Sequence, residues 1–108
     1  MRRTGFLAAA LSASLFAFAS PARADAIDGN WCRGDGKRMS IDGAAIVTPG
    51  GQKITGDYSR HAFSYVVPGG EPGAGAKVSI QLLSDYLAHA RQGSGPIEEW
   101  RRCPPGVS

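Results

Sequence analysis

Hydrophobic and polar residues alternate in several short runs along this chain, and residues typical of turns separate the runs at intervals of about ten positions. Such alternation predicts strands, because successive side chains of a β-strand point to opposite faces of a sheet. No hydrophobic period of the helical kind lasts for three turns. The expected strands are residues 37–41, 44–48, 52–58, 61–67, 77–83, 86–91 and 97–103.

This pattern predicts an all-β fold, either a small antiparallel up-and-down barrel or a curled meander of about six to seven strands. Closure of the sheet would also remove exposed strand edges. The sets of residues expected to share one face of a strand are Met39 with Ile41, Ile54 with Gly56 and Tyr58, Phe63 with Tyr65 and Val67, and Val78 with Ile80 and Leu82. Of these, the Phe63 set should point into the core.

Turn residues mark the ends of the expected strands. Asp42-Gly43 suits the positive φ angles of a type I′ hairpin turn, and residues 49–51 (Pro-Gly-Gly) form the next turn. Residues 68–76 include several prolines and glycines, so this stretch is expected to be a loop. Residues 79–92 are compatible with a helix as well as with strands, because Leu, Ala and Gln favour helices. Whether residues 84–92 are strand or helix therefore stays open at this point.

The first 24 residues are typical of a signal peptide. Arg2 and Arg3 precede an apolar run over residues 6–19, which is shorter than the roughly 20 residues that a membrane-spanning helix needs. Residues 22–24 (Ala-Arg-Ala) match the small-x-small pattern of a cleavage site. We therefore expect residues 1–24 to be removed and residues 25–108 to form a single β domain. The expected location is periplasmic or secreted, with no membrane anchor after cleavage; the paired arginines leave both general and twin-arginine export possible.

Signal removal also changes the charge of the protein. The chain has 12 Lys and Arg against 9 Asp and Glu, a formal net charge of +3. Three of the cations, Arg2, Arg3 and Arg23, lie in the expected signal peptide, so the remaining domain has a formal charge of zero. No cluster of basic residues is visible in that domain, and nucleic acids and membrane surfaces are therefore not expected as partners.

The two cysteines, Cys32 and Cys103, lie near the two ends of the expected domain. In an oxidising compartment an even pair predicts a disulfide. A bond closing so long a loop is expected to contribute roughly 4 kcal/mol in the chain-entropy model. A catalytic or metal-binding role is the alternative, but the pair has neither CxxC spacing nor histidines nearby.

The densest group of chemically capable residues extends from Asp57 to His61. A catalytic triad of Asp57, Ser59 and His61 is disfavoured, because neighbouring side chains of a strand point to opposite faces and do not converge on one atom. We expect a binding surface at the rim instead, formed by Arg60, His61, Tyr65 and Glu71 together with the loop of residues 68–76. The structural alternative is that His61 packs at the barrel rim on the same face as Phe63.

No metal site, cofactor or enzymatic activity is expected. His61 and His89 lie far apart in the sequence, without a second ligand at close spacing. Gly50-Gly51 and Gly69-Gly70 do not lead into a phosphate-binding helix and are expected to be turns. Residues 98–102 (Glu-Glu-Trp-Arg-Arg) alternate on a strand, which places Trp100 with Glu98 and Arg102, either as a closing core residue or as a binding aromatic.

Two resemblances follow from these residues. Gly29-Asn30-Trp31 resembles the Gly-x-Trp start of lipocalin-like barrels, which implies that an arginine near the end of the chain, Arg101 or Arg102, covers the tryptophan. The layout of the chain is similar to the small periplasmic inhibitors of C-type lysozyme. Those inhibitors use a Ser-Gly-x-x-Tyr loop, to which residues 55–58 (Thr-Gly-Asp-Tyr) are the nearest segment here. In style the chain resembles uncharacterised small exported proteins of Gram-negative bacteria, which implies a location and no particular activity.

These observations together predict a non-enzymatic binding or interaction module. Its expected partner is a protein or a small-molecule ligand of the cell envelope. The alternative function is inhibition of an envelope or host hydrolase such as lysozyme.

Overall fold

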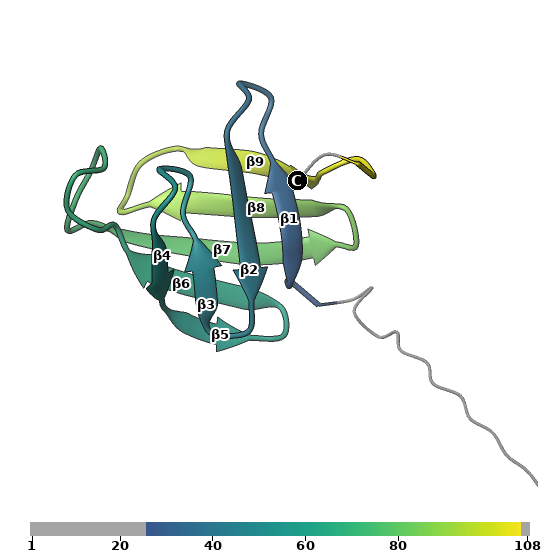
Figure 1. Ribbon diagram of the computed structural model, residues 1–108, viewed down its shortest axis with the longest axis horizontal. Coiled ribbons are helices and arrows are strands. Elements are labelled where there is room, and N and C mark those ends of the chain that lie inside the picture. The colour runs from purple at the N-terminus through teal and green to yellow at the C-terminus, as the bar shows by residue number, and fades with distance from the viewer. Residues whose placement is uncertain (1–25, 107–108) are drawn as a thin grey trace, which may run out of the picture.

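The structure is a computed structural model that describes residues 26–106. The expected signal peptide, residues 1–24, lies outside this range, as do Asp25 and the last two residues of the expected domain. The described residues form nine strands and no helix (Figure 1). The strands are β1 (Gly29–Cys32), β2 (Arg38–Asp42), β3 (Ala45–Val47), β4 (Lys53–Thr55), β5 (Asp57–Ser59), β6 (Ala62–Val66), β7 (Lys77–Ser84), β8 (Leu87–Gln92) and β9 (Ile97–Arg102).

All nine strands belong to one antiparallel sheet in the order β4-β3-β2-β1-β9-β8-β7-β6-β5. Strands that are neighbours in the sheet are also consecutive in sequence, with one exception. β1 pairs with β9, through Trp31↔Arg102 and Cys32↔Arg101. The sheet curls until β4 and β5 come together, which makes a nearly closed up-and-down barrel. The predicted all-β fold is confirmed, with more strands than expected. The helical alternative for residues 79–92 is wrong, because β7 and β8 pair closely as a hairpin.

The expected third strand, residues 52–58, is divided at Gly56 into β4 and β5. β4 pairs with β3, whereas β5 pairs with β6, so the chain passes from one edge of the sheet to the other at this residue. A Cβ atom on Gly56 would lie 2.4 Å from the Ser64 carbonyl oxygen and 2.6 Å from the Phe63 ring. Ile54 pairs with the buried Ile46 and Tyr58 with the buried Phe63, so both still lie on the inward face as expected, although Tyr58 is 40% exposed.

Two smaller differences concern the first hairpins. Strand β1 was not expected, because its four residues are too few to show an alternating pattern; it forms because β2 and β9 pair with its two edges. The turn after β2 consists of Gly43-Ala44, one residue later than expected, since Asp42 still pairs with Ala45. Gly43 has a φ of 58°, in the left-handed region that such turns require.

The core consists of the inward side chains of the strands, as the alternation predicts for Met39, Ile41, Phe63, Tyr65, Val67, Val78 and Ile80. The large side chains that are almost completely buried include Trp31 and Trp100, which lie on the paired strands β1 and β9. Trp100 is thus a core residue rather than an exposed aromatic. Ile54 and Leu82 are partly buried against the same cluster.

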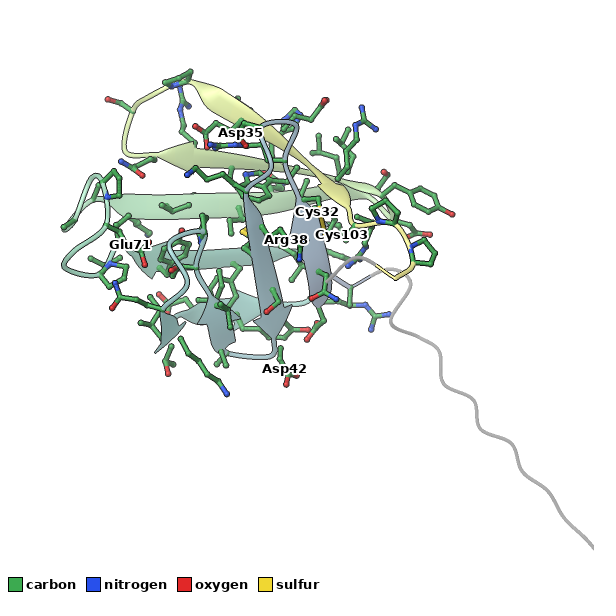
Figure 2. The ribbon with its side chains drawn as sticks, turned by 45° about the horizontal axis from the view of Figure 1, so that its top comes forward. Cys32, Asp35, Arg38, Asp42, Glu71 and Cys103 are labelled. Atoms are coloured by element: carbon green, nitrogen blue, oxygen red, sulfur yellow. A yellow bond between two sulfur atoms is a disulfide. The ribbon has the colours of Figure 1, made fainter. Side chains whose placement is uncertain are left out.

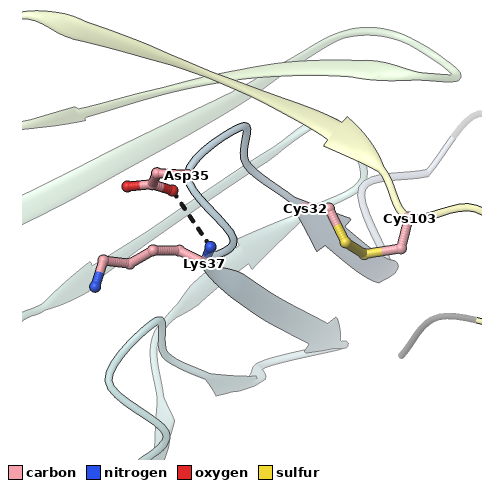
Figure 3. The surroundings of a disulfide bond; sticks show 4 residues. All are labelled: Cys32, Asp35, Lys37 and Cys103. Atoms are coloured by element: carbon pink, nitrogen blue, oxygen red, sulfur yellow. Dashed lines mark hydrogen bonds between the residues drawn. A yellow bond between two sulfur atoms is a disulfide. The ribbon is translucent and has the colours of Figure 1, made fainter.

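The expected disulfide between Cys32 and Cys103 is present, and it links β1 to the residue that follows β9 (Figure 3). The two Cα atoms are 5.0 Å apart, and 71 positions separate the residues in sequence. Only two residue pairs join β1 to β9, and the amide of Cys103 adds one further hydrogen bond to the Asn30 carbonyl, at 3.0 Å. The disulfide therefore reinforces the shortest pairing in the barrel.

Candidate functional site

The connections between strands gather at two opposite ends of the barrel. One end holds residues 33–37, 48–52, 67–76 and 93–96; in Figure 1 the first of these connections lies at the top of the molecule and the other three at its left. The other end holds the turns after β2, β5 and β7. Figure 2 shows Asp35 and Glu71 on loops of the first end and Asp42 at the end of β2, next to a turn of the second. We call the first end the open end and the second the closed end, for the reasons that follow.

The closed end is plugged by Trp31. Its indole Nε1 donates a hydrogen bond to the Ile27 carbonyl at 2.9 Å, and the guanidinium of Arg102 lies over its ring at 4.2 Å. Arg102 also donates hydrogen bonds to the carbonyls of Ala26, Asp28 and Asp85. Burial lowers the pKa of Arg102 from its usual value. The covering arginine that the Gly-x-Trp resemblance implies is thus Arg102 and not Arg101.

Arg60 and His61 lie at this closed end and not at the rim expected for them. Ser59 pairs with Ala62, so Arg60 and His61 form the two-residue turn between β5 and β6, and both are exposed. The expectation that His61 packs on the Phe63 face is therefore wrong, since a turn residue does not follow the alternation of the strand after it. The expected binding surface is divided: Arg60 and His61 are at one end of β6, whereas Glu71 lies beyond its other end.

The Asp57–Ser59–His61 sequence does not assemble a triad either. The Ser59 hydroxyl donates to the Ala62 carbonyl at 3.3 Å, which closes the turn locally. This hydrogen bond is a structural contact within the turn.

Glu71 fixes the loop of residues 68–76 against the β3–β4 turn. Its Oε2 atom accepts hydrogen bonds from Thr48 Oγ1 at 2.5 Å and from Gln52 Nε2 at 3.1 Å. Gln52 Nε2 also donates to the Gly69 carbonyl at 3.0 Å. Thr48 is almost completely buried, at 1% exposure. The carboxylate expected to bind a partner is therefore held within the protein and positions two loops of the open end.

The open end contains a cavity of about 280 Å³. Three of the four connections of this end, residues 33–37, 48–52 and 67–76, contribute to its edge, and inward side chains of the strands form its walls. The wall residues are Met39, Tyr65, Val67, Val78, Ala90 and Trp100, and the charged residues around them are Arg33, Lys37, Glu71, Arg91 and Glu98. Tyr65 and Glu71 thus contribute to one site, which excludes Arg60 and His61.

Arg33 joins the edge of the cavity to Trp100. Its guanidinium lies over the Trp100 ring, 5.2 Å from the centroid, and donates to Glu98 Oε1 at 2.5 Å. Its Nε and Nη2 atoms donate to the two carboxylate oxygens of Asp35, at 3.0 and 2.7 Å. The hydrogen bonds from Arg33 lower the pKa of Asp35 to about 2. Arg33 is thus paired with two carboxylates while it covers the indole.

Two residues of the cavity wall have polar groups in unusual surroundings, the phenol of Tyr65 and the indole N–H of Trp100. Burial raises the pKa of Tyr65 to about 12, and the negative charges of Glu71 and Glu98 add to this effect. The Tyr65 phenol therefore stays neutral at physiological pH. The buried Nε1 of Trp100 has no hydrogen-bond acceptor among the residues that the structure describes. Buried donors without partners are rare in native proteins, since each costs about 1–3 kcal/mol.

Sequence reasoning missed Arg33 and the function of Glu98. The position of Glu98 beside Trp100 could have been predicted, because the alternation in β9 places the two residues on one face. The contact of Arg33 with Glu98 could not have been predicted, since the distance between these residues is set by the pairing of β1 with β9. Glu99 and Arg101 lie on the outer face, where they form an exposed ion pair of 3.3 Å.

Residues 26–106 contain no group of three or more potential metal ligands. The same residues include no helix able to cross a membrane. No protein-family model, no curated protein and no solved structure matches the chain.

Proposed function

We propose that this chain is an exported, non-enzymatic binding module that takes a small molecule into the open end of its barrel. The observation that supports this proposal is the asymmetry between the two ends. Trp31 and Arg102 plug one end, whereas the other contains a cavity with apolar and aromatic walls and a charged edge. Ligand pockets typically combine such walls with a small number of polar groups.

The frame around the cavity is suited to binding. Its walls are paired strands, and its loops are held by the Glu71 hydrogen bonds and the Arg33 ion pairs. Loops fixed on a rigid sheet are common positions for binding residues, since less freedom is lost when the ligand binds. At about 280 Å³ the cavity is just below the usual range for drug-sized molecules, so its ligand is small.

The disulfide is compatible with an exported protein, because such bonds persist in oxidising compartments. Within this proposal the module acts in the periplasm or outside the cell, after removal of residues 1–24.

Native mass spectrometry tests this function. The oxidised protein is incubated with a small-molecule extract of the cell envelope, and we expect a bound adduct. Val67→Trp should abolish the adduct by filling the cavity, whereas a double Arg60→Ala/His61→Ala variant at the closed end should keep it. Circular dichroism shows whether each variant is folded. Absence of an adduct on the wild-type protein, or its retention by folded Val67→Trp, contradicts the proposal.

Inhibition of an envelope or host hydrolase such as lysozyme is the second candidate. The observation in its favour is a pair of exposed, largely apolar side chains near the closed end, Tyr86 at 69% and Leu83 at 49% exposure. Tyrosine is enriched in protein interfaces. Residues 55–58, the nearest match to the inhibitory loop, form the corner at Gly56 and do not project as a free loop. A lysozyme assay that compares wild type with Tyr86→Ala tests this function; equal lysozyme activity with and without the wild-type protein contradicts it.

A further inference from the structure

The indole N–H of Trp100 indicates which chemical group the cavity accepts. Trp100 contributes to the cavity wall and is 1% exposed, and its Nε1 has no acceptor among residues 26–106. The other tryptophan of the chain provides a comparison, because Trp31 Nε1 donates to the Ile27 carbonyl at 2.9 Å. One indole is thus satisfied within the fold, whereas the other belongs to a residue of the cavity wall and has no acceptor among the described residues.

The charges around the cavity indicate which ligands are disfavoured. Arg33 already binds Asp35 and Glu98, and Glu71 accepts hydrogen bonds from Thr48 and Gln52. A charged ligand in contact with the wall would have to leave water for a surface made mostly of apolar side chains, which is costly. The two other cations at the edge, Lys37 and Arg91, are exposed and therefore hydrated. The wall itself is apolar apart from the Tyr65 phenol and the Trp100 indole.

We propose that the cavity binds a small, uncharged and largely apolar molecule whose carbonyl-type oxygen accepts a hydrogen bond from Trp100 Nε1. This inference rests on the proposed function, because it names the ligand class for the same cavity. Arg33 has a positioning function: it covers the indole ring and, through Glu98, holds β9 to the β1–β2 hairpin.

Four compounds with the same number of non-hydrogen atoms test the ligand class. Acetophenone is neutral and has a carbonyl acceptor, cumene is neutral without one, benzoate is an anion, and benzamidinium is a cation. We expect acetophenone to bind about three- to tenfold more tightly than cumene, the gain from one net hydrogen bond. We expect both ions to bind more than about tenfold more weakly than acetophenone, owing to the lost hydration of a buried charge.

The two indole N–H signals in a ¹H–¹⁵N NMR spectrum provide the readout. A Trp31→Phe variant assigns them. Acetophenone should shift the Trp100 indole signal in a saturable manner and leave the Trp31 indole signal in place, whereas cumene should not shift the Trp100 N–H toward the position of a hydrogen-bonded indole. In Trp100→Phe, the preference for acetophenone over cumene should disappear. If that variant does not fold, the wild-type titration alone decides.

The outcomes separate the inference from the function on which it rests. If none of the four compounds binds, and the envelope extract also produces no adduct, the proposed function fails and the inference fails with it. If compounds bind in the cavity but cumene or either ion equals acetophenone, the binding function stands and the ligand class is wrong. Binding of acetophenone without a shift of the Trp100 indole signal likewise overturns the assigned hydrogen bond.

Discussion

The guanidinium of Arg102 lies over the indole ring of Trp31, with its Cζ atom 4.2 Å from the ring centroid. The two residues belong to the first and last strands, and they are backbone neighbours of each other across the β1–β9 pair. Arg102 combines this stacking with hydrogen bonds to backbone carbonyls of the segment before β1. It therefore fastens the start of the described chain over the closed end.

Replacement of Arg102 by alanine should lower the free energy of unfolding by about 1–3 kcal/mol, because it removes the cation–π contact and leaves carbonyls without their donor. The matched control is Arg101→Ala, since Arg101 is exposed on the outer face and should change stability by no more than about 0.5 kcal/mol. Urea denaturation monitored by fluorescence measures both. Equal losses in the two variants would show that the stacking contributes nothing.

The disulfide should have a larger effect than any single side chain. In Cys32→Ala/Cys103→Ala the free energy of unfolding should fall by roughly 2–5 kcal/mol, because the bond spans 71 positions and reinforces the two-pair contact between β1 and β9. Chemical denaturation of the double variant and of wild type with and without reductant measures the loss. Coinciding midpoints under both conditions would contradict this expectation.

Gly56 is expected to tolerate no side chain. Gly56→Ala places a Cβ atom 2.4 Å from the Ser64 carbonyl oxygen, so β5 must shift away from β6 at a cost of about 1–3 kcal/mol. Gly69→Ala is the control, because a Cβ atom there meets nothing within 4 Å. Thermal unfolding of the two variants should separate them clearly; a Gly56→Ala protein as stable as Gly69→Ala would show that the corner is adaptable.

Tyr65 should make the protein less stable at high pH. Its pKa is raised from 10.0 to about 12 in the folded protein, so the folded state keeps a phenol proton that the unfolded state loses first. The stabilisation is complete below pH 10 and is lost as the pH rises through about 12; its upper bound is about 3 kcal/mol, which solvent screening lowers. Denaturation at a series of pH values in this range measures the slope, and Tyr65→Phe should remove its Tyr65-dependent part. An identical slope in Tyr65→Phe refutes the assignment.

Local patterns in the sequence predicted most of the fold. The alternation over residues 37–41, 61–67 and 77–83 identified β2, β6 and β7 and most of their buried residues, because the direction of a strand side chain depends only on its position. The disulfide followed from there being two cysteines. The all-β class followed from turn residues at short intervals.

The candidate site was predicted less well. Tyr65 was identified, and Glu71 lies at the cavity edge, although its carboxylate binds Thr48 and Gln52 rather than a partner. Arg60 and His61 were placed with them incorrectly. They adjoin the start of β6 and Glu71 follows its end, so the whole length of this strand separates them; nearness in sequence did not correspond to nearness in space.

The sequence by itself determined most of the strands, turns and inward faces and the pairing of the cysteines, because each of these depends on residues that are close in the chain or few in number. It did not determine the short strand β1 or the division of residues 52–58 at Gly56. Tertiary structure alone decided where the barrel closes, which end is plugged and which contains the cavity. Those features depend on contacts between distant residues, such as Arg102 over Trp31 and Arg33 with Glu98. Such contacts form only when the curl of the sheet brings β1 to β9. No local pattern in the sequence predicts that these two strands lie side by side.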